Sequence, residues 1–364
     1  MNTLAAVLVE TGQPLELVDL EIPALKPGQA LVAIAHSGVC HTQVLEARGH
    51  RGEDRFLPHC LGHEGAGVVL EVGKGVTKVK PGQRAILSWI KGGGTDVPGS
   101  QYRMNGNGRV VNAGGVTTFS RHAVISENRL TPLPEGVPLD VAALLGCALP
   151  TGFGAVLNTA RARGGESVAV FGCGGVGLCA IAGAAATGCT PIIAVDVNPA
   201  KLDVARAMGA THVIDAGGGD AVEAIRALCT GGVDITIEAT GRPAVMHQAL
   251  AAVRPRGGRA VIVGNARHGQ MLAIDPQQLN QGKRLLGTWG GDSVPDRDYP
   301  RYAELVAANE IDLSPLMRDR YVLADVNAAL TDLEAGRALR PMLDIAVCRP
   351  LSAVSCDRSA SIVS

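Results

Sequence analysis

The chain has 364 residues, enough for two domains of the usual size of about 100 to 200 residues each. It carries 33 basic and 34 acidic side chains without a block of like charges, so neither a nucleic acid nor an anionic membrane surface is expected as a partner. The first residues lack a basic leader and a cleavage signal, and no apolar run reaches about 18 residues, so we expect a cytoplasmic protein that acts on a small molecule.

Residues 1 to 145 predict a β-rich domain. Short apolar runs, broken by glycine and proline, predict strands at residues 5–10, 30–38, 64–73 and 84–90. The segment from Trp89 to Thr118 is rich in glycine and asparagine, and we interpret it as an extended surface loop.

From residue 151 to 290 the pattern changes to strands that alternate with helices. Apolar runs at residues 167–172, 191–196, 211–215, 234–241, 259–264 and 284–290 predict six strands separated by alanine-rich helices. One of these helices has Asn198 as its N-cap, Pro199 in its first turn and Gly209 after its end. This pattern is typical of a doubly wound parallel sheet and gives an α/β fold class.

After residue 291 the sequence predicts helices and one short strand, at residues 339–347, that rejoins the first domain. We therefore predict a β-rich domain of residues 1–148 and 291–348 and a dinucleotide-binding domain of residues 149–290. The last residues, 349–364, are small, polar and aperiodic, which is typical of a flexible tail.

A glycine motif lies between the first predicted strand and helix of the second domain. Gly172, Gly174 and Gly177 have the GxGxxG spacing, with Gly175 between them. Such glycines allow a tight turn, close approach of the backbone to a pyrophosphate, and close packing of helix on strand. The next strand ends at Asp196, whose carboxylate can bind ribose hydroxyls and repel the extra phosphate of NADP, so we predict NAD. Lys201 either reaches the same ribose or is a solvated charge.

Three side chains have the chemistry of zinc ligands: Cys40, His63 and Cys147. Each of them also has a simpler interpretation, as a buried thiol or a hydrogen-bonded core histidine. Their separations in the sequence do not decide between the two interpretations.

The surrounding motifs resemble those of the zinc-containing alcohol dehydrogenases of the medium-chain dehydrogenase/reductase family. GVCHT, GHEGAGVVLEVG, GCALPTGFGA, FGCGGVGL and VDVN occur in the order of that family, and the resemblance extends to about Ile345. It implies a GroES-like β-rich catalytic domain, a Rossmann domain, and a cleft between them for zinc and NAD. It also implies a small alcohol or carbonyl substrate and a homodimer or homotetramer.

The resemblance also implies roles for individual residues. Cys40, His63 and Cys147 would bind zinc, Glu64 would be an acid close to the metal, and Thr42 would bind the substrate oxygen and start a proton relay. The residues that would contact the cofactor are His41 and Arg340 at the pyrophosphate, and Thr151, Val176, Val263 and Gly264 at the nicotinamide.

Three features depart from the family. Many members bind a structural zinc through four closely spaced cysteines; residues 89–118 contain no cysteine, so we predict one zinc per chain. Gln43 replaces a common aspartate, and we expect its amide oxygen to accept a hydrogen bond from His63 without adding charge. Leu45 replaces a histidine that ends the relay in some members; His50 either takes its place or is an exposed loop residue.

Three functions remain open at this point. The leading one is an NAD-dependent zinc alcohol dehydrogenase. The second is a zinc-free reductase of activated double bonds, similar to the quinone reductases of the same superfamily. The third is a protein that binds NAD without catalysis. Trp89 either lines the cleft or packs in the core.

Overall fold

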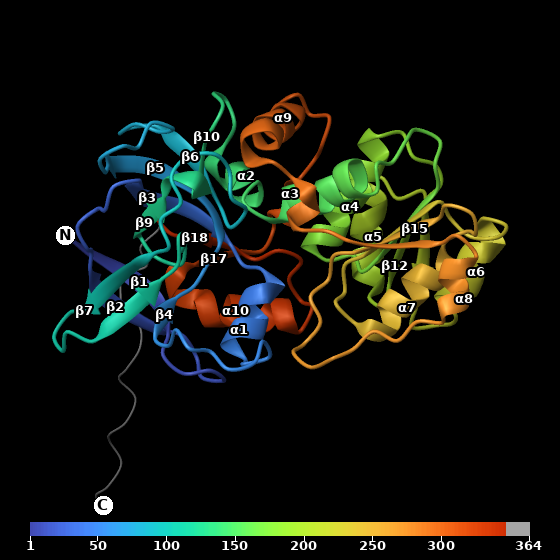
Figure 1. Ribbon diagram of the computed structural model, residues 1–364, viewed down its shortest axis with the longest axis horizontal. Helices are drawn as coiled ribbons and strands as arrows, with labels where there is room; N and C mark the ends of the chain where they lie inside the picture. Colours follow the sequence, from blue (N-terminus) through green and yellow to red (C-terminus); the bar gives the residue numbers. More distant parts are fainter. Residues whose placement is uncertain (347–364) are drawn as a thin grey trace, which may run out of the picture.

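The computed structural model describes residues 1–346, which form two lobes (Figure 1). The predicted tail at 349–364 lies outside these residues. One lobe contains strands β1 to β10, β17 and β18, and the other contains β11 to β16 with helices α4 to α8. No helix within residues 1–346 combines the length and the apolar character needed to cross a bilayer.

Five strands of the first lobe close into a barrel, in the order β1, β2, β7, β8, β4. Their bounds are Asn2–Leu8, Glu16–Glu21, Ser100–Met104, Val110–Ala113 and His59–Cys60, respectively. The hairpin β7–β8 lies in the segment that we predicted to be a surface loop, so that prediction was wrong. Tyr102 and Met104 alternate with exposed neighbours and face the barrel core. Within the predicted loop, residues 91–99 and the turn around Gly106 do lie outside the strands.

The second sheet of this lobe has the order β10, β6, β5, β3, β18, β17, with β9 also paired to β3. The bounds are Leu130–Pro132, Arg84–Ser88, Glu64–Val72, Gln29–Gly38, Met342–Asp344, Arg320–Val322 and, for β9, His122–Ser126. The pairing of Met342 with Gly38 brings the end of the described chain back to the first lobe, as predicted. Helices α1 (His41–Ala47), α2 (Leu139–Leu144) and α10 (Val326–Glu334) pack on this lobe.

The second lobe contains the predicted doubly wound sheet, with all of its strands parallel, in the order β13, β12, β11, β14, β15, β16. The bounds are His212–Asp215, Ile192–Asp196, Val168–Phe171, Ile235–Glu238, Arg259–Ile262 and Arg284–Gly287. Alternate residues of β11 enter different hydrophobic clusters: Val168 and Val170 pack with α4 and α5, whereas Ala169 and Phe171 pack with α6 and α7. The fold class predicted from the sequence is therefore confirmed.

The helices of this lobe are α4 (Gly175–Ala186), α5 (Pro199–Ala207), α6 (Ala221–Leu228), α7 (Pro243–Ala252) and α8 (Pro276–Asn280). The Asn198 side chain caps α5 by accepting the Ala200 N–H at 3.0 Å, as its sequence predicted. Helices α3 (Ala148–Gly154) and α9 (Pro295–Ala307) lie where the two lobes meet (Figure 1). Helix α3 packs closely on α4 and so joins the first lobe to the glycine motif.

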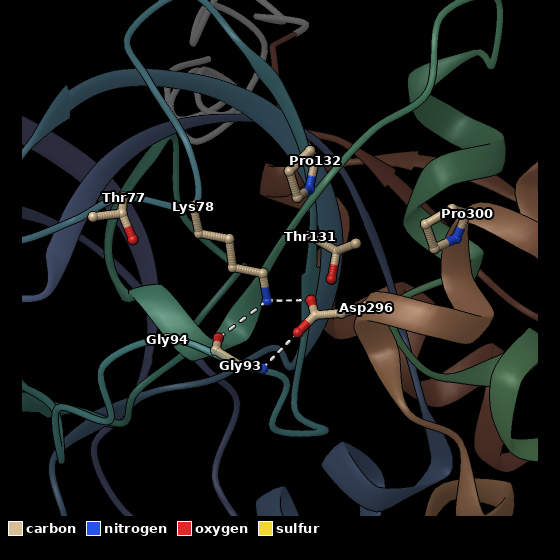
Figure 2. Close-up of a pocket in the computed structure, with 8 residues that line it drawn as sticks. All are labelled: Thr77, Lys78, Gly93, Gly94, Thr131, Pro132, Asp296 and Pro300. Atoms are coloured by element: carbon tan, nitrogen blue, oxygen red, sulfur yellow. Dashed lines mark hydrogen bonds and ion pairs between the residues drawn. The ribbon is translucent and has the colours of Figure 1, made fainter.

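Residues 91–97 precede the β7–β8 hairpin and are hydrogen-bonded to α9. The Asp296 carboxylate accepts the Gly93 N–H at 2.6 Å and pairs with the Lys78 ammonium, which also donates to the Gly93 carbonyl at 3.2 Å (Figure 2). These groups border an open cavity of about 500 Å³. Hydrogen bonds between side chains and backbone thus anchor a segment that contains no metal-binding cysteine.

The Glu127 side chain also holds residues 91–97 in place, through a hydrogen bond to Thr95. Its side chain is 1% exposed and accepts three backbone N–H groups, from Thr77 at 2.6 Å, Lys78 at 3.0 Å and Thr95 at 2.8 Å. Although burial opposes the charge, these hydrogen bonds lower the pKa of Glu127 to about 2. The carboxylate therefore contributes stability above the ordinary glutamate pKa and loses that contribution as the pH falls toward 2.

We expect Glu127→Gln to lower the free energy of unfolding at neutral pH by about 1.5 to 3 kcal/mol, since the charged acceptor of several hydrogen bonds is lost. The difference from the native chain should shrink as the pH falls below about 4.5, because Glu127 then takes up a proton in the unfolded chain but keeps its charge in the folded chain until about pH 2. Urea unfolding across this pH range measures both effects. Glu135→Gln, at an exposed site, is the control; an equal effect at both sites would contradict the role of Glu127.

Candidate active site

Three potential metal ligands come together from separate parts of the first lobe. Cys40 precedes α1, His63 precedes β5, and Cys147 precedes α3. One ligand atom of each lies within 4.8 Å of the others, and within residues 1–346 this is the one such cluster of three. The His63 Nε2 atom is buried and has no hydrogen-bond partner in the described part of the chain. Two sulfurs and an unpaired imidazole nitrogen fit a zinc ion with one position left for a substrate.

The electrostatics of this cluster favour thiolate at Cys40. A hydrogen bond from the Cys147 thiol lowers the pKa of Cys40 well below the ordinary value, against the effect of burial, and the nearby Arg340 and His63 act in the same direction. Zinc binds cysteine as the thiolate. The surroundings of Cys40 therefore favour the form that a metal requires.

A buried ion pair supports the cluster from behind. Glu64 is fully buried, and one of its oxygens accepts a hydrogen bond from the Arg340 guanidinium, which is 3% exposed. The other oxygen accepts the Ala148 N–H at 3.2 Å, next to Cys147. Gly38 makes room for this carboxylate, because a Cβ there would lie 2.0 Å from it. The pair therefore fixes the backbone next to one ligand.

Thr42 lies beside the cluster and touches the second lobe. Its Oγ1 is 3.7 Å from the Cys40 sulfur. Asn265, which follows β15, donates its side-chain N–H to the same oxygen at 3.5 Å. Sequence reasoning singled out the neighbouring Val263 and Gly264 but did not find Asn265, because 223 positions separate Asn265 from Thr42.

The position of Gln43 differs from the prediction. Its amide oxygen accepts the Cys40 N–H at 2.9 Å, and its amide nitrogen faces Nδ1 of His63. Gln43 is the third residue of α1, and its oxygen is used to cap that helix through the Cys40 backbone. The expected hydrogen bond from His63 to the amide oxygen is therefore not made.

This arrangement is unfavourable for a metal-bound His63. When Nε2 binds a metal, Nδ1 carries the proton, so Gln43 would face two N–H donors with a single acceptor oxygen. A carboxylate of the same length would accept from both donors.

We therefore expect Gln43→Glu to raise zinc affinity by about 10- to 100-fold, the usual effect of a hydrogen-bond partner behind a ligand histidine. Competition against a zinc chelator measures this change without relying on turnover. Gln43→Met, which removes both hydrogen bonds, is the comparison. The account of Gln43 fails if the glutamate variant releases zinc as readily as the native chain.

The predicted glycine motif has the geometry of a phosphate cradle. Gly172 has a positive φ of 93°, and a Cβ on Gly177 would lie only 1.8 Å from the Gly172 carbonyl oxygen. A Cβ on Gly174 would meet nothing within 4 Å, so open space lies beside the N-terminus of α4. The Asp196 carboxylate, at the end of β12, accepts N–H groups from Cys173 at 2.7 Å and Asn198 at 2.9 Å, which holds it next to this turn.

The other predicted cofactor residues surround this cradle. Arg340 packs against Gly175, and its Nε atom is buried without a partner among the described residues. Partial burial, together with the charges of Lys201 and Arg267, lowers the pKa of His41. The positive charges of Arg340, Lys201 and Arg267, together with the open space beside α4, fit an anionic dinucleotide.

At the expected nicotinamide end, Thr151 has a buried hydroxyl without a partner in residues 1–346, and Val176 is half-buried in the first turn of α4. The N–H groups of Val263 and Gly264 both donate to the Glu238 carbonyl, at 2.9 and 3.0 Å. The carbonyl groups of these two residues, and not their N–H groups, are therefore the ones available to a cofactor.

The chain is similar to known proteins over most of its length. Residues 26–135 match the alcohol dehydrogenase GroES-like domain, and residues 175–308 match the zinc-binding dehydrogenase family. An S-(hydroxymethyl)glutathione dehydrogenase of Synechocystis is 35% identical over 94% of this chain and 100% of that protein. A protein of the same name from Escherichia coli is 34% identical over the same shares.

Solved structures give the same result. An alcohol dehydrogenase zinc-binding domain protein from Burkholderia ambifaria superposes with a TM-score of 0.88 at 32% identity, covering 95% of this chain and 99% of that one. Benzyl alcohol dehydrogenase from Acinetobacter calcoaceticus has a TM-score of 0.87 at 29% identity, covering 95% and 100%. Because these relatives match nearly the whole chain, with both domains and the ligand cluster in place, the chain belongs to the zinc-containing alcohol dehydrogenases of the medium-chain dehydrogenase/reductase family.

Proposed function

We propose that this protein interconverts alcohols and their aldehydes or ketones with NAD, using one zinc held by Cys40, His63 and Cys147. The observation that carries the proposal is the convergence of these three side chains within 4.8 Å, with the unpaired Nε2 of His63 among them. The zinc-free reductase and the non-catalytic NAD-binding protein give no reason for this convergence.

Each group then has a distinct task. When bound, zinc polarises the alcohol oxygen as a Lewis acid and the nicotinamide takes up the hydride. Thr42 is half-buried, and its Oγ1 would accept the alcohol proton through the lone pair that Asn265 does not use and release its own hydroxyl proton to solvent water. Glu64, held by Arg340 and the Ala148 N–H, keeps the backbone at Cys147 in place and lies close enough to influence the metal.

The cofactor residues divide between the two lobes. The backbone at Gly172, Gly174, Gly175 and Gly177 would hold the pyrophosphate, with His41 and Arg340 closing over it from the first lobe. Asp196, and Lys201 beside it, would bind the adenosine ribose. Thr151, Val176, Val263 and Gly264 would surround the nicotinamide. We assign residues 1–148 and 291–348 to the catalytic domain and 149–290 to the cofactor domain, in line with the separate sheets of the two lobes.

We also propose a homo-oligomer. Strand β16 ends the parallel sheet, and among the described residues it pairs on one side only, with β15. Two copies that pair along β16 would bury this edge, which otherwise presents unpaired backbone groups. Light scattering coupled to size-exclusion chromatography measures the mass in solution; a monomer at all concentrations would overturn this point.

The experiment for the proposed function combines metal analysis with a turnover assay. We expect one zinc per chain and NADH formation from alcohols. The substrate panel should include benzyl alcohol and S-(hydroxymethyl)glutathione, because similar proteins carry those names. Zinc-loaded protein that binds NADH but turns over no alcohol and reduces no carbonyl compound would overturn the proposal.

The choice of NAD over NADP depends on Asp196. We expect Asp196→Asn to lower the ratio of kcat/KM for NAD to that for NADP by about 10- to 100-fold, because a charged acceptor for the ribose and a repulsive charge against its phosphate are both lost. Initial rates with each cofactor measure the ratio. Asp203→Asn, on the exposed face of α5, is the control. An unchanged ratio in Asp196→Asn would contradict the assignment.

A further inference from the structure

A buried pair of hydroxyl groups lies next to the backbone of a predicted zinc ligand. Ser88 is the last residue of β6 and is 2% exposed, and Tyr299, in α9, is 0% exposed. The Ser88 Oγ atom and the Tyr299 hydroxyl oxygen are 2.7 Å apart. Because 211 positions separate the two residues, this contact exists only in the folded chain.

The Ser88 hydroxyl makes every hydrogen bond that a serine hydroxyl can make. It donates to the Gly146 carbonyl at 2.7 Å and accepts the Ile90 N–H at 3.0 Å. Since its one proton is used at Gly146, the proton between Ser88 and Tyr299 comes from the phenol. Burial raises the pKa of Tyr299 above its ordinary value, so the phenol keeps this proton. Tyr299 therefore orients the Ser88 hydroxyl toward the Gly146 carbonyl.

The Gly146 carbonyl belongs to the same peptide group as the Cys147 N–H. A peptide group is planar, so a hydrogen bond that fixes this carbonyl also fixes the peptide plane that leads into Cys147. Cys147 is the last residue of the short link between α2 and α3. The direction in which its side chain meets the other two ligands therefore depends on the Gly146 peptide.

The same serine is connected to a second ligand, His63. Ser88 lies opposite Glu64 in the antiparallel pairing of β6 with β5, and Glu64 directly follows His63. The residue after Ser88, Trp89, lies edge to face with the His63 ring at a centroid distance of 6.4 Å. Gly146 packs closely on Glu64, since a Cβ on Gly146 would lie 2.8 Å from the Glu64 Cβ. Ser88 thus bridges the backbone segments that carry two of the three ligands.

On the basis of the proposed zinc site, we propose that Ser88 is a positioning residue for the metal and that Tyr299 acts through it. Ser88 sets the place of Cys147 relative to His63, and Tyr299 fixes the direction of the Ser88 hydroxyl. Metal affinity depends on how firmly the surrounding residues hold the ligands, so loss of this hydroxyl weakens zinc binding although no ligand atom is removed.

Zinc affinity is measured in Ser88→Ala and in the native chain by competition with a chelator. We expect Ser88→Ala to bind zinc about tenfold more weakly, within the usual effect of residues that support metal ligands. The variant should still bind one zinc per chain at saturation, because all three ligands remain. Native affinity in Ser88→Ala would overturn the inference.

Thr236→Val is the matched control. The Thr236 hydroxyl is also buried, at 0% exposure, and donates to the Ala249 carbonyl at 2.9 Å, but it lies on β14 in the other lobe. We expect this variant to unfold at a lower urea concentration, as Ser88→Ala does, and to keep native zinc affinity. An equal loss of zinc affinity in both variants would show a general effect of buried hydroxyl groups and would count against the role of Ser88.

The absorption spectrum of the cobalt-substituted protein tests positioning directly. Co²⁺ in place of zinc absorbs visible light, and the energies and intensities of its bands depend on the coordination geometry. We expect the bands to shift in Ser88→Ala and to remain native in Thr236→Val. A native cobalt spectrum in Ser88→Ala would contradict the inference.

Tyr299→Phe tests the role of the phenol and keeps the Ser88 hydroxyl, so it also serves if Ser88→Ala does not fold. We expect it to weaken zinc binding several-fold, less than Ser88→Ala does. Because Tyr299 acts through Ser88, adding Tyr299→Phe to Ser88→Ala should cause no further loss of zinc affinity. Native affinity in Tyr299→Phe, or fully additive losses in the double variant, would show that Tyr299 does not act through Ser88.

The inference and the proposed reaction fail in different ways. If the native chain turns over alcohols and Ser88→Ala keeps native zinc affinity, the reaction is confirmed and the role of Ser88 is wrong. If the native chain binds zinc but turns over no alcohol, and Ser88→Ala binds zinc more weakly, the role of Ser88 stands and the proposed reaction fails.

Discussion

Cys147→Ala is expected to leave the protein without stoichiometric zinc and to lower alcohol turnover by about three orders of magnitude or more. The variant keeps Cys40 and His63, but two protein ligands do not hold a catalytic zinc in a defined geometry. Loss of Lewis-acid stabilisation worth several kcal/mol gives a rate loss of this size. Elemental analysis and the rate of NADH formation measure the two effects on the same sample.

The matched control is Cys60→Ala. Cys60 is 6% exposed and Cys147 is 5% exposed, so the two substitutions remove similarly buried thiols. Cys60 lies on β4 of the barrel and is not part of the ligand cluster. We expect Cys60→Ala to retain its zinc. Full zinc content and normal turnover in Cys147→Ala would show that the ligand set is wrong, and loss of zinc in both variants would indicate general destabilisation.

The dinucleotide-binding lobe could be predicted almost completely from the sequence, because its signals are local. The strand that ends at Phe171 leads directly into Gly172 and α4, and the next strand ends at Asp196, all within about thirty residues. In such a unit each strand is buried on both faces, so its residues form a continuous apolar run that is easy to recognise. The predicted and observed strands accordingly overlap at all six positions.

The barrel was harder to predict because its closure depends on pairing between distant segments. Strand β7 pairs with β2, and Met104 lies opposite Leu20. The alternation of Tyr102 and Met104 with polar neighbours was present in the sequence, but it is short and adjoins a glycine-rich turn. Local composition thus outweighed the periodic signal, and the hairpin was interpreted as a loop.

The candidate zinc site shows the same contrast between local sequence signals and contacts that form only in the folded protein. Cys40, His63 and Cys147 were found through the motifs around them, because their separation carries no geometric information. Asn265 contributes from a loop of the second lobe, and its contact with Thr42 exists only after the two lobes have come together. The orientation of Gln43 depends on the capping of α1, which a residue-by-residue comparison does not reveal.

The second large effect is expected at the buried pair of Glu64 and Arg340, whose side chains are 0% and 3% exposed. Arg340→Met should lower the free energy of unfolding by about 3 to 5 kcal/mol, since it leaves a carboxylate buried without its counter-charge. Although burial opposes its charge, Glu64 and the neighbouring thiols raise the pKa of Arg340 well above its ordinary value, so the arginine is charged at all relevant pH values. Urea unfolding of the zinc-loaded protein measures the loss.

A double-mutant cycle separates the interaction between Glu64 and Arg340 from the interactions that each side chain makes with the rest of the protein. Glu64→Gln together with Arg340→Met should be more stable than Arg340→Met alone, because the double variant no longer buries an unpaired charge. The surface pair of Arg48 and Glu334, with atoms 2.9 Å apart and side chains 28% and 36% exposed, is the control. Arg48→Met should cost at most about 1 kcal/mol, because solvent already screens that pair. Suppose instead that Arg340→Met lowers the free energy of unfolding no more than Arg48→Met does. The buried pair would then not be what holds the backbone beside Cys147, and the variant would retain zinc as well as the native chain does.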